Sequence, residues 1–138
     1  MIDVSVNALA VISAAVLNMA VGMLWYGPLF GKPWMRHVGM TPEKLEAEKK
    51  KGMGKTMAFA FAASLVIAYA LAVFAGMLGI TDASGGAKLG VMLWFGFLAT
   101  TQLDGVLWEG KSTTLYGINV SYRLATFVLM AVLVAVWR

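Results

Sequence analysis

Four long apolar runs constrain this chain more than any other feature of its sequence. They cover, in order, about residues 4–26, 56–78, 89–108 and 115–137. A helix that crosses the hydrocarbon core of a bilayer needs about 20 apolar residues. The third run carries one charged residue, Asp104, the fourth carries Arg123, and the first two carry none. The sequence therefore predicts an all-α membrane protein, a single domain of residues 1–138 built as a four-transmembrane-helix bundle.

The overall composition also indicates that membrane lipid surrounds this chain and is its partner. Of the 138 residues, 60% are hydrophobic and 13% are charged, whereas soluble domains have about 45–50% and about 25%. The net charge of +4 comes mostly from one loop, which favours membrane lipids and not nucleic acid as its partner. Because the chain has no Cys and a single His, His37, we expect no metal and no other cofactor.

The loop between the first two runs, about residues 28–55, predicts the orientation of the protein. It holds seven cations against three carboxylates: Lys32, Arg36, Lys44, Lys49, Lys50, Lys51 and Lys55 against Glu43, Glu46 and Glu48. Loops rich in Lys and Arg stay in the cytoplasm, so both termini are predicted outside, in a multi-pass protein of the inner membrane. Within the loop, Thr41 as N-cap and Pro42 at the first helical position predict a short helix up to Lys51.

The aromatic stretch LWYGPLFGKPWMRH follows the first apolar run. Trp25, Tyr26 and Trp34 are predicted to be anchors at the headgroup level, where Trp and Tyr are enriched. Proline lacks an N–H group and disfavours helix at the preceding residue, so Pro28 is predicted to end the first helix at Gly27. The alternative is a partly re-entrant loop that lines a cavity.

This stretch resembles a known family. The pattern WYGPLFGKPWM after an Asn-containing first helix, followed by a charged loop and three further spans, is similar to the small bacterial integral-membrane family DUF1761 (domain of unknown function 1761). The four-span layout extends the resemblance over nearly the whole chain. The resemblance implies a four-helix protein of the bacterial inner membrane. It implies no reaction.

Small residues predict how the helices pack. They recur every four positions in the first span, at Ala10, Ala14, Asn18 and Gly22, and in the second, at Ala60, Ser64, Ala68, Ala72 and Gly76. Such stripes let helix backbones approach closely in lipid, so the first two spans are predicted to meet each other or a second copy. Gly86 and Gly90 add a GxxxG pattern. We expect tight packing within one chain, and the alternative is a homodimer face.

The two intramembrane charges are the most informative residues. Counted from a hairpin centre near residue 113, Asp104 and Arg123 lie at matching depth, about 14 Å away. A lone charge at such a depth costs about 2.5–3.5 kcal/mol, so the count predicts an ion pair between them. We expect Asn18, Asn119 and Tyr116 to join these two residues in one buried polar layer. Gln102 is predicted to point away from it.

Two functions remain open at this point. A polar layer inside the membrane is typical of a transporter or permeation subunit, because intramembrane ionisable groups often mark such pathways. The alternative is a non-catalytic module that binds lipid or a partner, with a structural ion pair. The sequence contains no nucleophile elbow, metal-ligand set or phosphate loop, so we do not expect an enzyme.

Overall fold

The computed structural model describes residues 5–137, and all regular secondary structure in this part of the chain is helical. Its elements are, in order, α1 (Ala8–Leu24), η1 (Trp25–Leu29), α2 (Gly31–Val38), α3 (Pro42–Lys51), α4 (Gly54–Met77), α5 (Ala83–Leu93), η2 (Trp94–Ala99), α6 (Thr100–Trp108) and α7 (Thr113–Val136). Within the described residues, four continuous helical segments are long and apolar enough to cross a membrane: Ala8–Leu29, Gly54–Met77, Ala83–Trp108 and Thr113–Val136. The prediction of an all-α membrane bundle is confirmed.

Side-chain caps fix where four of the helices begin. Asn7, Asp82 and Ser112 each accept hydrogen bonds from backbone N–H groups of the first turn of α1, α5 and α7. These groups have no partner inside the helix, so a cap that binds them stabilises the helix by about 1 kcal/mol. The predicted cap of α3 is confirmed, because Thr41 accepts a hydrogen bond from the N–H of Lys44 at 3.2 Å.

The first span does not end at Pro28, and that prediction is wrong. The helix continues as a π-turn, η1, with Pro28 inside it, and the N–H of Phe30 bonds the carbonyl of Trp25 at 2.8 Å. The wider π-turn makes room for the proline ring, and the carbonyl of Trp25 accepts its hydrogen bond from a residue five positions later, not four. The next residue, Gly31, starts α2, where an added Cβ would lie 2.8 Å from the carbonyl oxygen of Tyr26. The segment Gly31–Val38, which contains Pro33, is thus a helix.

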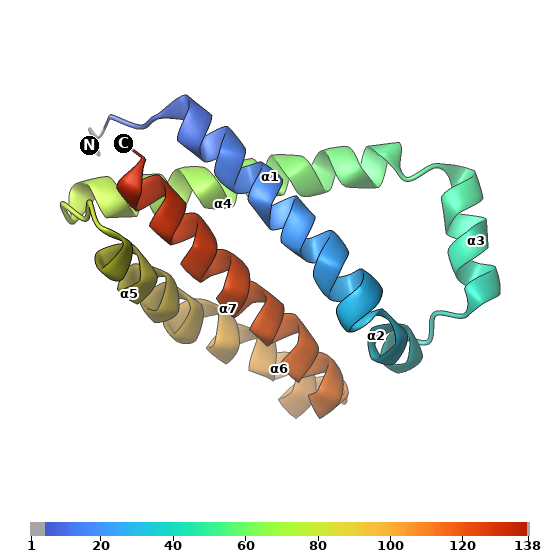
Figure 1. Ribbon diagram of the computed structural model, residues 1–138. Helices are drawn as coiled ribbons and strands as arrows, with labels where there is room; N and C mark the ends of the chain where they lie inside the picture. The colour runs from blue at the N-terminus through green and yellow to red at the C-terminus, as the bar shows by residue number, and fades with distance from the viewer. Residues whose placement is uncertain (1–4, 138) are drawn as a thin grey trace.

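The spans alternate in direction, and α7 lies at their centre (Figure 1). The start of α1 and the end of α7 lie at one end of the bundle, and α2 and the α6–α7 hairpin lie at the other. Helix α4 crosses α1 and α7 obliquely, while α3 stands apart from the bundle. Because α7 packs against α1, α4, α5 and α6, it is the helix on which a buried site can be assembled from several spans.

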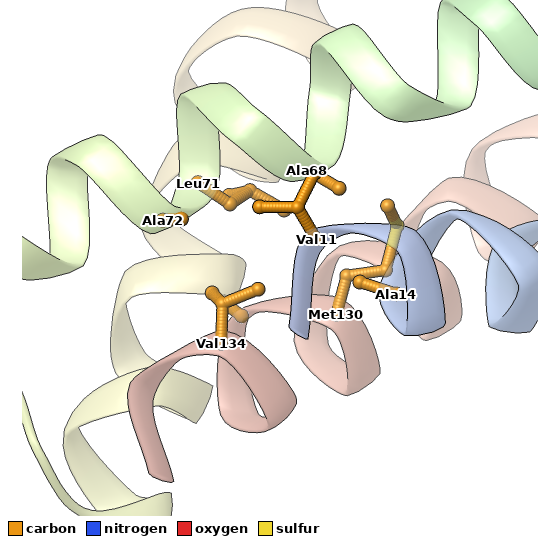
Figure 2. Packing of buried hydrophobic residues seen from close by; sticks show 8 residues of the cluster. Val11, Ala14, Ala68, Leu71, Ala72, Met130 and Val134 are labelled. Carbon is orange, nitrogen blue, oxygen red and sulfur yellow. The ribbon is translucent and has the colours of Figure 1, made fainter. Parts of the chain in front are cut away.

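The main hydrophobic core lies where α1, α4 and α7 cross (Figure 2). Val11 and Ala14 of α1 face Ala68 and Leu71 of α4, and Met130 of α7 fills the space between them. Ala14, Ala68 and Met130 have no solvent-accessible surface. The small side chains bring the backbones together, as the stripes predicted, and α1 meets α4 within one chain.

Helix α5 packs on α7 through glycine. A Cβ added at Gly86 would lie 2.8 Å from the Cα of Val132, and one added at Gly90 would lie 2.7 Å from the carbonyl oxygen of Phe127. Both neighbours are backbone atoms of α7, so only glycine permits this approach. The GxxxG pattern therefore serves packing inside the chain, the first of the two alternatives.

Candidate functional site: a polar layer around Arg123

A buried hydrogen-bond network links three spans just beyond the hydrophobic core. The Asn18 side chain donates to the Ser64 hydroxyl at 2.6 Å, and Ser64 in turn donates to the Ala60 carbonyl at 2.9 Å. From α7, the Tyr122 hydroxyl donates to the side-chain and backbone oxygens of Asn18, each at 3.1 Å. Polar groups buried away from water are costly unless they are hydrogen-bonded. The network therefore fixes the positions of α1, α4 and α7 relative to one another.

Two tryptophans hold the π-turns against α7. Trp25 opens η1 and donates its indole N–H to the carbonyl of Ile118 at 3.2 Å. Trp94 opens η2 and donates to the carbonyl of Val120 at 2.7 Å. Each indole thus satisfies its single donor while its ring packs in apolar surroundings. Because π-turns occur frequently at functional sites, their convergence on one turn of α7, at residues 118–120, marks this part of the helix.

Arg123 lies in this region with an unsatisfied donor. Its Nη1 atom is buried and has no hydrogen-bond partner among the described residues. Its guanidinium carbon lies 5.1 Å from the centre of the Tyr122 ring, which is cation–π distance. An arginine side chain keeps its charge in proteins and carries five N–H donors. The stacked ring therefore compensates part of the charge and leaves hydrogen-bonding capacity unused.

An open cleft of about 320 Å³ adjoins Arg123. We call it the Arg123 cleft; it is lined by Tyr26, Gln102, Asn119, Tyr122 and Arg123. The Tyr26 hydroxyl donates to the Asn119 side-chain oxygen at 2.6 Å, so the NH₂ group of that amide is a donor which this contact does not use. Arg123 is the one charged residue in the lining, so the cleft offers one positive charge and several neutral donors.

A second polar cleft, of about 470 Å³, opens toward the α6–α7 hairpin. This hairpin cleft is lined by Thr101, Gln102, Asp104, Gly105, Val106, Glu109, Lys111, Leu115, Tyr116 and Asn119. Gln102 and Asn119 belong to both clefts, so the two are neighbours along α6 and α7. The Tyr116 hydroxyl donates to the carbonyl of Ala99 at 2.6 Å, and Lys111 pairs with Glu109 at 3.1 Å.

The predicted ion pair between Asp104 and Arg123 is not formed, and that prediction is wrong. The ion pairs of the described residues are Lys51–Glu48 and Lys111–Glu109. The cause is the hairpin, which spans Glu109 to Ser112 and is not centred at residue 113. Asp104 therefore lies four residues inside α6, about 6 Å from its end, whereas Arg123 lies ten residues inside α7, about 15 Å from its start. Asp104 is exposed and near the helix end.

The structure brings most of the predicted polar layer together and adds members that the sequence analysis missed. Asn119 and Arg123 share one cleft, Tyr116 and Asp104 line the adjoining one, and Asn18 joins the layer through Tyr122. Tyr122 was missed. The prediction that Gln102 points away is also wrong.

The π-turn η2 explains the error on Gln102. Gly96 and Thr100 are exposed, because η2 interrupts the regular helix between them and a π-turn advances more residues per turn than an α-turn. A count at α-helical spacing therefore loses its register across η2. A signal did exist: the π-turns open with the similar sequences WYGPL at residue 25 and WFGFL at residue 94.

The predicted anchors face inward. Trp25 and Tyr26 point to α7, and Trp34 packs edge-on against Tyr26 with ring centres 5.5 Å apart. Their place at the headgroup level stays a prediction. His37 is exposed, and its ring nitrogen Nδ1 lies 2.7 Å from the carbonyl oxygen of Pro33. Among residues 5–137, no group of His, Asp and Glu side chains is arranged to hold a metal ion.

Four apolar spans around a polar layer define this chain as a polytopic membrane protein of the all-α class. More specifically, it belongs to the family DUF1761, described as a protein of unknown function, whose family model matches residues 9–135. The resemblance seen in the sequence is therefore confirmed. No curated protein and no solved structure matches the chain.

Proposed function

We propose that this protein binds a small anionic group inside the membrane, at the Arg123 cleft, as part of a transport or permeation role. The observation that carries the proposal is that Arg123 lines an open cleft while its buried Nη1 has no hydrogen-bond partner among the described residues. The proposed role is binding and passage, without catalysis.

The energetics of a buried cation support this proposal. A charge inside the membrane costs at least about 2.5–3.5 kcal/mol on insertion scales. Since Asp104 is too far along the hairpin to neutralise Arg123, an anion in the cleft would offset the cost by forming charge-assisted hydrogen bonds with the guanidinium. The Asn119 amide and Gln102 line the same cleft and supply neutral donors. One cation in the lining favours a ligand with a single negative charge.

The surroundings of the cleft support access from one side. The hairpin cleft adjoins it and leads toward the α6–α7 end of the bundle. In the other direction along α7, Thr126 and Met130 are fully buried in the helix contacts. An anion would therefore enter and leave from the hairpin end in this conformation, and a passage to the other side would require α7 and its neighbours to move.

Binding of benzenesulfonate to the purified protein in nanodiscs tests the proposal. This probe is a permanent monoanion, and benzyl alcohol is its neutral counterpart. We expect benzenesulfonate alone to quench tryptophan fluorescence saturably, and Arg123→Gln to weaken its binding about ten- to hundredfold, as the loss of charged hydrogen bonds predicts. Arg36→Gln, which removes an exposed cation of α2, is the control and should bind normally. Equal binding by both variants would refute the site.

Uptake of radiolabelled benzenesulfonate into proteoliposomes separates transport from binding. Uptake that requires Arg123 and exceeds that of empty liposomes would support the permeation role. Binding that depends on Arg123 without any such uptake would refute that role and leave a binding protein.

A further inference from the structure

An apolar hollow follows the Arg123 cleft along α7. This apolar groove has a volume of about 270 Å³ and is formed by α4, the α5–η2 junction and α7. It is lined by Val66, Ile67, Ala70, Leu71, Phe74, Leu93, Phe97, Leu98 and Phe127. Ala70, Phe74 and Phe97 are exposed along it, so its floor is built by the bundle but nothing in the described chain covers it.

The groove and the cleft are consecutive along two helices. On α7, Phe127 of the groove lies four residues after Arg123 of the cleft. On the opposite wall, Leu98 of the groove lies four residues before Gln102 of the cleft. Within the regular helix α7, positions four residues apart lie on one face about 6 Å from each other. Leu98 belongs to η2 and Gln102 to α6, so for this pair only the order along the span follows, with Gln102 nearer the hairpin. On both walls the lining therefore changes from polar to apolar in the direction away from the hairpin.

Counted from the hairpin, the polar hollow comes first along α7 and the apolar hollow second. Arg123 lies ten residues into α7 and Phe127 fourteen, so the groove is farther from the hairpin end than the cleft by about 6 Å. A molecule with its head at Arg123 and its tail in the groove would hold its head near the middle of the span, on the hairpin side, and would extend its tail past the middle, away from the hairpin.

We propose that the ligand is a single-chain monoanionic amphiphile, with its head on Arg123 and its alkyl chain in the apolar groove. This inference rests on the proposed function and specifies its substrate class. The single cation in the cleft lining selects one negative charge, and the single groove selects one chain. A second copy of this protein would cover the groove without using the cleft, and a two-chain lipid would leave one chain outside the single groove.

Alkylsulfonates of different length test the inference in nanodiscs. We expect hexadecanesulfonate to bind more tightly than butanesulfonate, and hexadecyltrimethylammonium, with the same chain and the opposite charge, not to compete. Ala70→Phe fills the groove and should weaken hexadecanesulfonate binding at least about tenfold, since tenfold equals the burial of about two methylene groups. Butanesulfonate binding should not change. Ala63→Phe, also exposed on α4 but outside the groove, is the matched control.

A second variant keeps the test independent of a single substitution. Phe97 is exposed, and Phe97→Ala removes one wall of the groove without disturbing a buried contact. It should also weaken the binding of hexadecanesulfonate only.

The outcomes distinguish this inference from the proposed function. If affinity rises with the length of the alkyl chain but neither groove variant weakens the binding of hexadecanesulfonate, the inference is overturned. Loss of butanesulfonate binding in Arg123→Gln would in that case still support the anion site. If both sulfonates bind Arg123→Gln as tightly as the wild type, the two proposals are overturned together. A change in particle mass caused by Ala70→Phe, with unchanged hexadecanesulfonate affinity, would identify the groove as a contact between copies and would also overturn the inference.

Discussion

Replacement of Gly90 by alanine tests the closest helix contact in the bundle. The new methyl group would lie 2.7 Å from the carbonyl oxygen of Phe127 and 2.8 Å from the Cα of Val128. Non-bonded heavy atoms prefer about 3.5–4.0 Å, so α5 would have to move away from α7 by about 1 Å. Overpacking of this kind costs about 1–3 kcal/mol. We therefore expect the free energy of unfolding to fall.

The matched control for this substitution is Gly117→Ala on α7. Nothing lies within 4 Å of a Cβ at Gly117, so the alanine should stabilise the helix by about 0.5–1 kcal/mol through lower backbone entropy in the unfolded chain. Reversible unfolding in mixed detergent and SDS micelles should rank Gly90→Ala below Gly117→Ala by about 1–3 kcal/mol. Equal stability of the two variants would refute the close packing of α5 on α7.

Three further predictions concern the polar layer and the orientation. Asn18→Ala should lower the free energy of unfolding by about 1 kcal/mol, because the Tyr122 hydroxyl keeps the backbone carbonyl of residue 18 as acceptor; a loss above about 3 kcal/mol in the same micelle assay would contradict this. Asp104→Asn should change it by less than about 0.5 kcal/mol, since this carboxylate is exposed; a loss of about 3 kcal/mol or more would revive a buried ion pair. An impermeant thiol reagent added to cells should label Ser84→Cys but not Lys49→Cys, because the basic loop should face the cytoplasm; the reverse pattern would invert the topology.

The class of the fold could be read from the sequence because lipid imposes simple rules. Apolar runs of sufficient length, small-residue stripes and the cap at Thr41 are local signals, and the structure bears each of them out. Pro28 shows where local rules fail. Its effect on the helix depends on whether the backbone can widen into a π-turn, and the contacts that α7 supplies to Trp25 stabilise that turn from outside the segment.

The sequence predicted many of the residues that form the site, but it did not predict which residues of neighbouring helices face one another. Asn119 and Arg123 share a regular stripe of α7, so spacing alone placed them together. The partners from the third span could not be placed, because η2 shifts the register and Ser112, as the cap of α7, moves the hairpin by several residues toward α6. An error of three residues in the hairpin centre shifts the expected depth of a residue by about 4.5 Å on each helix. Because the shifts on α6 and α7 are opposite, two residues expected to face each other lie about 9 Å apart in depth. This is enough to separate an ion pair.

An anomalous-scattering experiment tests the central claim most directly. Crystals of the protein in lipid, soaked with para-bromobenzenesulfonate, locate the anion by the bromine signal. The account predicts a bromine peak in the Arg123 cleft, with sulfonate oxygens within hydrogen-bond distance of the guanidinium, and no peak there in Arg123→Gln crystals. An empty cleft beside Arg123 in saturated wild-type crystals would contradict the account, as would a peak that persists in the variant.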